Sequence, residues 1–319
     1  MKITKSMTVA AVLAVLSILL WVHGPADGRS IAPEPPPRAT PTGVSVEPSL
    51  PAPPDGSAWR EAAAYRAEGS YSHALEIYDG LTAEGGDARW LAFLRADSTW
   101  RALSATGQPE DTGLVAARDA LARLAEPTDG VDRIVVESLE SLGDFYWMRP
   151  NGENWNAAWT HYSKALEAWA QSRDLELAGD RYVAIVARAS RRRDTPSWWR
   201  GGWQPSLPPD VVENAARIAR TPEDRALTRY LLALALRQDV SSPARYDRAV
   251  AAFEEAATLG RGSDWHDDTL WQLAQMRLSP GRPEPSPGGG SRYTPEYVEA
   301  AETLDRLVAI YPEGASRHS

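Results

Sequence analysis

The chain has 319 residues, of which 43% are hydrophobic and 24% are charged, and these values are typical of a globular protein. A formal net charge of −9 disfavours nucleic acid as a partner, because a polyanion would be repelled. The sequence contains no cysteine, which excludes disulfides, thiolate metal sites and a cysteine nucleophile.

The first 26 residues have the pattern of a segment that directs export. Lys2 and Lys5 precede an uncharged apolar run at residues 7–22, as in a signal peptide or a membrane anchor. Cleavage after Ala26 and retention as an anchor both stay open, as does a buried helix of the folded domain. Both a cleaved signal peptide and a retained anchor would place the rest of the chain in the periplasm or cell envelope. Membrane contact would then be confined to residues 7–22 of an uncleaved chain.

Residues 27–57 form a proline-rich segment that we expect to be a disordered linker. Nine prolines lie between positions 31 and 57, and proline removes backbone donors and favours extended geometry. The segment could act as a spacer between a membrane and a folded domain, or it could be an unstructured leader without a role. The folded domain is expected at residues 58–319.

The remaining sequence predicts an all-α fold, because strand patterns are nearly absent and good helix formers dominate. We expect six antiparallel helical hairpins. Thr221 and Thr294, each followed by proline and acidic residues, indicate helix starts, and Asp210 with Glu213 resembles a capping box. The expected helices span residues 58–68, 71–84, 87–105, 113–125, 131–148, 155–171, 174–192, 210–219, 222–237, 244–259, 266–278 and 295–311.

One spacing recurs in four of these hairpins. A small alanine is followed four residues later by a large side chain and three residues after that by another apolar residue, which places all three on one helical face. The alanine would let a neighbouring helix approach closely. The four copies are Ala74/Tyr78/Leu81, Ala158/Tyr162/Ala165, Ala249/Phe253/Ala256 and Ala300/Leu304/Leu307.

With Leu142, Gly143 and Tyr146 upstream of the second copy, this pattern resembles the tetratricopeptide repeat (TPR). Leu139 stands where that family usually has tryptophan, and several gaps between copies are not multiples of 34 residues. The resemblance implies an α-solenoid that works through protein–protein interaction.

In that family the first helix of each hairpin lines a concave groove that receives peptides. Matching positions here are Glu137, Glu140, Asp144 and Trp147 in the third hairpin and Asp268 and Trp271 in the sixth. The resemblance therefore implies a protein or peptide partner, and an acidic groove would favour a basic or aromatic segment. The alternative is a merely solvated face.

A second resemblance lies in the C-terminal half. Four segments together are similar to the helical N-terminal region of bacterial alpha-2-macroglobulin-like proteins: Ser197 to Trp203, Ala215 to Leu236, the tetrapeptide starting at Trp265, and Tyr311 to Arg317. That family traps proteases, sometimes through a thioester built on cysteine. This chain has neither cysteine nor β-domains before Ser319, so trapping is not implied, and a fragment of a longer protein is expected. A stand-alone envelope-assembly protein is the alternative.

Three tryptophans in the loop at residues 194–209 form the last candidate group. Trp198, Trp199 and Trp203 could fill the seam between hairpins, since burial of such rings is strongly stabilising. They could instead form an exposed aromatic binding site. Both interpretations stay open.

No segment predicts catalysis, a metal or a cofactor. Glycine-rich phosphate loops and nucleophile-elbow motifs are absent. Asp267 and Asp268, which follow His266, are better explained as acids that complement the dipole at a helix start than as ligands of a metal ion. We therefore expect an exported, non-enzymatic interaction scaffold. A peptidoglycan-acting enzyme built on a helical superhelix is the alternative, although no residues remain for its catalytic domain.

Overall fold

The computed structural model describes residues 54–105, 112–127, 130–149, 154–191, 205, 207–263, 265–286 and 290–312. Within these ranges the chain forms twelve helices and a two-stranded sheet, which confirms the all-α prediction at the level of fold class. The expected export segment at residues 1–26 and the linker up to residue 53 lie outside the described residues, as does the tryptophan group Trp198, Trp199 and Trp203. None of the described helices combines the length and apolar character needed to cross a bilayer.

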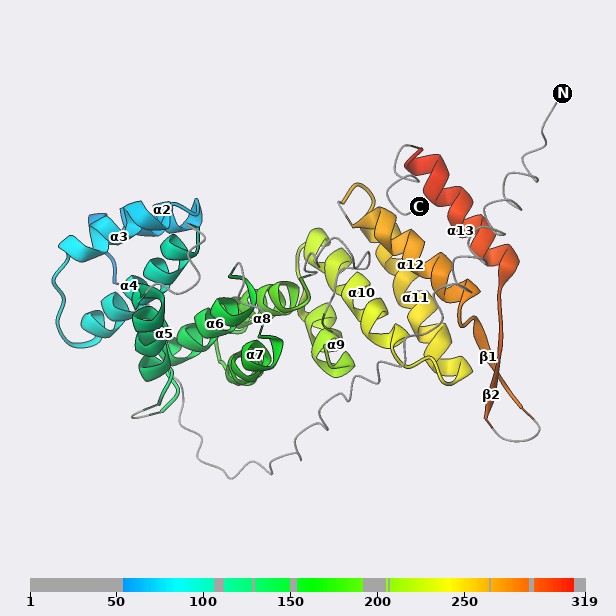
Figure 1. Ribbon diagram of the computed structural model, residues 1–319, viewed down its shortest axis with the longest axis horizontal. Coiled ribbons are helices and arrows are strands. Elements are labelled where there is room, and N and C mark those ends of the chain that lie inside the picture. The colour runs from blue at the N-terminus through cyan, green and yellow to red at the C-terminus, as the bar shows by residue number, and fades with distance from the viewer. Residues whose placement is uncertain are drawn as a thin grey trace.

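Each predicted helix corresponds to an observed one, with ends that differ by at most four residues. The helices are α2 (Ser57–Ala67), α3 (Tyr71–Gly80), α4 (Gly85–Ala105), α5 (Thr112–Leu124), α6 (Arg133–Trp147), α7 (Trp155–Ala170), α8 (Leu175–Ala189), α9 (Pro209–Ile218), α10 (Pro222–Arg237), α11 (Pro243–Leu259), α12 (His266–Leu278) and α13 (Tyr297–Ile310). Helices that follow each other in the chain pack together, and the molecule extends from α2 and α3 at one end to α13 near the other (Figure 1).

Side-chain caps fix several of the helix starts. The predicted cap at Thr221 is confirmed, because its side chain accepts a hydrogen bond from the amide of Asp224. Two other predictions are wrong. Pro208 is the residue before α9, so Asp210 lies inside the helix rather than capping it. Thr294 ends a strand, and α13 begins only at Tyr297.

The recurring alanine and aromatic positions are buried, as the spacing predicts. Their side chains lie between neighbouring helices, and Leu304, the non-aromatic member, is only partly buried. The fully buried members, each at most 1% exposed, are Ala74, Tyr78, Ala158, Tyr162, Ala249, Phe253 and Ala300.

A short β-hairpin separates α12 from α13, in a stretch where the sequence predicts neither helix nor strand. Strand β1 (Arg282–Pro285) pairs antiparallel with β2 (Ser291–Thr294). The hairpin lies along α11, where Arg282 forms an ion pair with Asp247 at 2.9 Å. Strands of four residues, one of them with two prolines, carry no readable alternation, which explains why they escape prediction.

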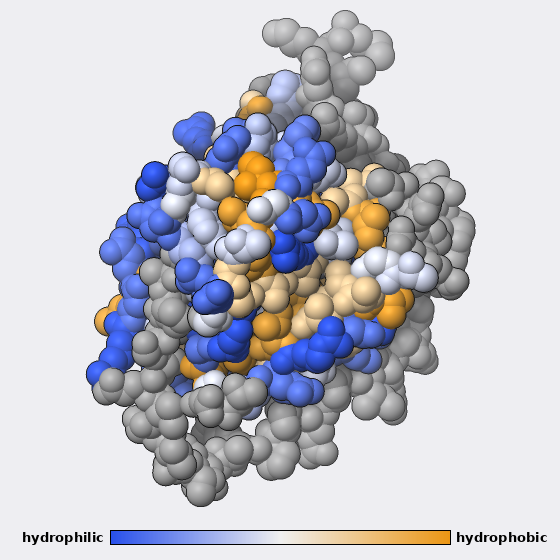
Figure 2. Space-filling model, turned by 90° about the vertical axis from the view of Figure 1, so that its left-hand side faces the viewer, coloured by the Kyte–Doolittle hydropathy of each residue, from blue (hydrophilic) through white to orange (hydrophobic). Residues whose placement is uncertain are grey.

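The end of the molecule formed by α2–α5 has an apolar centre. Figure 2 shows this end, with apolar side chains in the middle and hydrophilic residues around them. Helix α2 leaves three small apolar side chains exposed, Ala63, Ala64 and Ala67.

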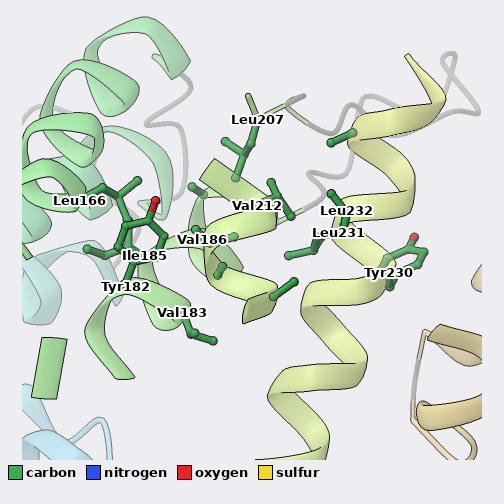
Figure 3. Close-up of a cluster of buried hydrophobic side chains, with 14 of the residues drawn as sticks. Leu166, Tyr182, Val183, Ile185, Val186, Leu207, Val212, Tyr230, Leu231 and Leu232 are labelled. Atoms are coloured by element: carbon green, nitrogen blue, oxygen red, sulfur yellow. The ribbon is translucent and has the colours of Figure 1, made fainter. Parts of the chain in front are cut away.

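Two large apolar clusters form the core and meet at α6. One joins α2–α6 and includes Ile134, Leu142 and Phe145. The other runs from α6 to α12 and includes Val135 and Trp147. Figure 3 shows part of this second cluster, where side chains from α7 through α10 come together.

Candidate functional site

A polar hollow opens between the alternate helices α2, α4, α6 and α8, with Tyr71 at the start of α3 also in its wall. It has a volume of about 370 Å³. Ala63, Ala67, Tyr71 and Phe93 form an apolar part of its wall, and four arginines, four acidic residues and Ser141 form the rest. We call this hollow the groove.

Asp97 of α4 is the first fixed point in the groove wall. Its carboxylate accepts hydrogen bonds from Nη2 of Arg66 at 2.6 Å, from Nε of Arg101 at 3.0 Å and from the hydroxyl of Ser141 at 2.6 Å. The Ser141 oxygen in turn accepts from the indole N–H of Trp100 at 2.9 Å. Helices α2, α4 and α6 are thus joined through a single carboxylate.

Asp144 of α6 is the second fixed point. It accepts hydrogen bonds from Nη2 of Arg101 at 2.8 Å, from Nε of Arg188 at 2.9 Å and from the hydroxyl of Tyr162 at 2.7 Å. Arg101 therefore bridges Asp97 and Asp144, and Arg188 brings α8 into the same network.

Glu140 and Glu137 continue the network along α6. Glu140 accepts from Nη2 of Arg188 and from the indole N–H of Trp169, at 2.9 and 2.6 Å. Glu137 is paired with Arg133 at 2.7 Å and with Arg181 at 2.8 Å, and Arg181 also lies 3.6 Å from Glu140. The result is one continuous chain of alternating charges, which we call the ion-pair chain: Arg66, Asp97, Arg101, Asp144, Arg188, Glu140, Arg181, Glu137 and Arg133.

The ionisation of the buried acids follows from their partners. Burial alone would raise the pKa of Asp97, but Arg101 and Arg66 outweigh it and hold the pKa well below its usual range. Burial would also raise the pKa of Asp144, but the positive charges of Arg188 and Arg101 outweigh it, and the pKa is lowered. At Glu140 burial prevails over Arg181 and Arg188, so its pKa rises. Asp97 and Asp144 are therefore anionic in the folded chain at neutral pH.

The cations, not the acids, reach the surface of the groove. Side chains of the four acids are 1–9% exposed, whereas those of the five arginines are 16–32% exposed. The expected acidic surface at Glu137, Glu140 and Asp144 is accordingly corrected: these residues line the groove, but arginines cover their carboxylates. The physical reason is that an unpaired buried carboxylate is very costly.

The other sequence-predicted residues lie elsewhere. Trp147 is 2% exposed and packs edge-to-face on Trp155, with ring centroids 5.2 Å apart, so it belongs to the core rather than to the groove surface. Trp271 is partly buried against a small cluster that contains Leu270 and Leu307. Asp268 accepts a hydrogen bond from Tyr230.

Asp268 lines a second hollow, of about 470 Å³, which is mainly apolar. Leu227, Leu231 and Trp265 contribute much of its wall, and Arg188 is shared with the groove. The six predicted residues that the structure describes therefore do not form a single surface.

Sequence reasoning missed the arginines of the groove. Their signal is a helical spacing: Arg181 and Arg188 are seven residues apart on α8, and Arg101 follows Asp97 by four. Charges at such spacing inside otherwise apolar helices indicate a buried ionic face. Sequence alone could have found this pattern, although not which partners meet.

The described residues offer no group of three or more potential metal ligands. His266 instead sits between the hydroxyl of Tyr311 and the carbonyl of Ala257, both at 2.8 Å, close to the predicted start of α12. What the groove can do chemically is bind and orient a charged group. No known protein family, curated protein or solved structure matches the chain.

Proposed function

We propose that the chain is a non-enzymatic protein-interaction scaffold whose helices form a TPR-like α-solenoid. The observation that carries this proposal is the groove itself. Its wall comes mainly from every second helix, α2, α4, α6 and α8, and it presents partly exposed arginine side chains beside apolar side chains. A surface of this kind suits a segment of a protein partner.

Two packing features support the solenoid. The alanine and aromatic positions of the repeated spacing are buried between neighbouring helices in all four hairpins where the pattern occurs, apart from the partly buried Leu304. Gly143, which resembles the glycine of the TPR pattern, faces the ring of Tyr162 from the next helix. In an array of hairpins such contacts would recur from one unit to the next.

The cellular setting is part of the same proposal. The apolar run at residues 7–22 would direct export to the periplasm or cell envelope, either as a signal peptide or as an inner-membrane anchor. There the chain would act as the helical N-terminal part of an alpha-2-macroglobulin-like protein, or as a stand-alone envelope-assembly protein.

Site-directed photo-cross-linking in bacterial cells tests the scaffold. A photoreactive residue at Ala63, which is exposed and lines the groove, should capture a discrete protein partner. The same residue at Ala122, which is exposed on α5 outside the groove, is the matched control. Absence of any adduct at Ala63, or equal adducts at both positions, would contradict the proposal.

The enzymatic alternative is tested separately. Each acid of the groove is held by at least one arginine and is less than a tenth exposed, which supports the scaffold over proton transfer at these positions. Incubation of the purified chain with peptidoglycan should release no soluble fragments. Turnover that depends on Glu140 would favour the enzyme instead.

A further inference from the structure

We propose that the groove receives an acidic segment of its partner and binds one carboxylate beside Arg101 and Arg188. This inference rests on the proposed scaffold function and specifies the partner's chemistry. It reverses the expectation of a basic segment, which assumed that the acids of α6 form the surface.

The first argument concerns unused hydrogen-bond donors. Arg101 and Arg188 bind opposite oxygens of Asp144, the first through Nη2 and the second through Nε. Their remaining contacts use Nε of Arg101 and Nη2 of Arg188. Nη1 of each guanidinium therefore donates to no protein atom among the described residues. These side chains are 22% and 27% exposed and line the groove.

The second argument concerns charge. The groove wall itself holds four arginines and four acids, and Arg133, which pairs with Glu137 from outside the groove, gives the ion-pair chain one positive charge in excess. A single carboxylate restores neutrality and also supplies two acceptor oxygens for guanidinium N–H groups. A lysine or arginine would add to the excess.

The third argument concerns a buried donor next to the same place. Nε of Arg66 is buried without a hydrogen-bond partner in the described structure, although Nη2 of this residue is bound to Asp97. A buried unsatisfied N–H is costly. Because this atom is closed off even when the groove is empty, an acceptor of the bound segment would satisfy it only if the Arg66 side chain turned toward the groove on binding.

The fourth argument concerns the apolar part of the wall. Ala63 and Ala67 of α2 lie on one side, with Tyr71 and Phe93 beside them. The Tyr71 ring lies 5.6 Å from the Arg101 guanidinium. A carboxylate at the arginines would thus leave neighbouring small apolar side chains against this wall. The fitting segment alternates acidic and small apolar residues.

The test measures binding of short synthetic peptides to the full chain by fluorescence anisotropy. Three amidated peptides of equal length alternate alanine with aspartate, asparagine or lysine, and a fourth is the asparagine peptide with a free C-terminal carboxylate. The aspartate peptide should bind roughly tenfold more tightly than the asparagine peptide, with an affinity that falls as salt rises. The fourth peptide shows whether a terminal carboxylate serves as well as a side-chain carboxylate.

Substitutions locate the site. Arg188→Lys keeps the charge but loses the planar fork of donors, so it should weaken binding of the aspartate peptide. Arg220→Lys is the control, because Arg220 pairs with Asp180 at 2.7 Å on the exposed surface. If Arg188→Lys does not fold, Arg181→Lys replaces it, and the peptide series on the wild-type chain decides independently.

The outcomes separate this inference from the scaffold proposal. Preference for the lysine peptide, or equal affinity for aspartate and asparagine peptides, overturns the acidic partner while cross-linking at Ala63 still supports a scaffold. Binding of the aspartate peptide that neither groove variant weakens overturns the assignment to this groove. Loss of both peptide binding and cross-linking overturns both proposals.

Discussion

Gly143 of α6 faces the aromatic ring of Tyr162 of α7 so closely that a Cβ at position 143 would lie within 2.9 Å of Cγ of that ring. Gly143→Ala should therefore displace Tyr162 and disturb its 2.7 Å hydrogen bond to Asp144. We expect a loss of about 1–3 kcal/mol in the free energy of unfolding, as for other overpacked cores. Urea denaturation followed by circular dichroism measures it.

Gly179 is the matched control for that substitution. It also lies inside a helix, α8, but a Cβ there would meet nothing within 4 Å. Gly179→Ala should stabilise the chain by about 0.5–1 kcal/mol, because alanine is the better helix former. Equal effects of the two substitutions would contradict the close packing at Gly143.

Asp97→Asn should be among the most damaging single substitutions in the chain. The amide would leave Arg66 and Arg101 without their shared anion in a site where the carboxylate is 1% exposed. Breaking a buried ion pair costs about 3–5 kcal/mol. Asp119→Asn is the control, since Asp119 is 48% exposed and pairs only with its neighbour Arg118 among the described ion pairs. That control should stay within about 0.5 kcal/mol of the wild type.

Acid should weaken the fold through Asp97 and Asp144. Both have pKa values lowered in the folded state by neighbouring arginines, although burial opposes the shift. Their contribution to stability is therefore complete above the unfolded pKa of about 3.9 and is lost as the pH falls through the lower folded values. Glu140, whose pKa is raised by burial, has the opposite sign and loses its contribution as the pH rises.

Denaturation midpoints at pH 5, 4 and 3 measure this dependence. The free energy of unfolding should drop below about pH 4. In this range Asp97 and Asp144 become protonated in the unfolded chain but stay ionised in the folded chain. In a folded Asp97→Asn chain the drop should be smaller. A drop of undiminished size in that variant would assign the acid sensitivity to other carboxyls.

His266 should make the packing of α13 sensitive to mild acid. Nε2 lies next to the carbonyl of Ala257, which can only accept, so Nε2 carries the ring proton of the neutral imidazole and donates it. Nδ1 then has no proton and accepts a hydrogen bond from the Tyr311 hydroxyl. Burial lowers the pKa of His266 despite the Ala257 carbonyl and Asp267, and the nearby Arg306 and Arg261 lower it further. Its stabilising contribution is complete above the unfolded pKa of about 6.5 and falls as the pH drops below it.

Hydrogen exchange of α13 at pH 7 and pH 5, corrected for intrinsic rates, tests this dependence. Exchange should be faster at pH 5. His266→Gln keeps one donor and one acceptor but cannot gain a proton, so it should remove most of the difference. An unchanged difference in this variant would exclude His266 as the cause.

The helices of this fold were predictable because their signals are local. Thr221 caps α10 through the amide three residues ahead, and that information lies within four positions of the chain. The spacing of Ala158 and Tyr162 likewise identified a buried face. The hairpin of β1 and β2 was missed because its strands are too short for a periodic pattern.

The groove was only half predictable, because its character depends on contacts between distant segments. The TPR resemblance implied that Glu140 and Asp144 line a groove, and both do line one. Whether that groove is acidic depends on Arg188, which lies 44 residues beyond Asp144 in the chain. Helix periodicity contains no information about the register between α6 and α8, so the covering cation could not be foreseen.

Helix α6 contributes Ile134 to one apolar cluster and Val135 to the other, and it also supplies four members of the ion-pair chain. Unfolding of the residues of either cluster would remove packing contacts that hold α6 in place against the other cluster. The α2–α6 part and the α6–α12 part should consequently be coupled in unfolding, so that loss of one lowers the stability of the other.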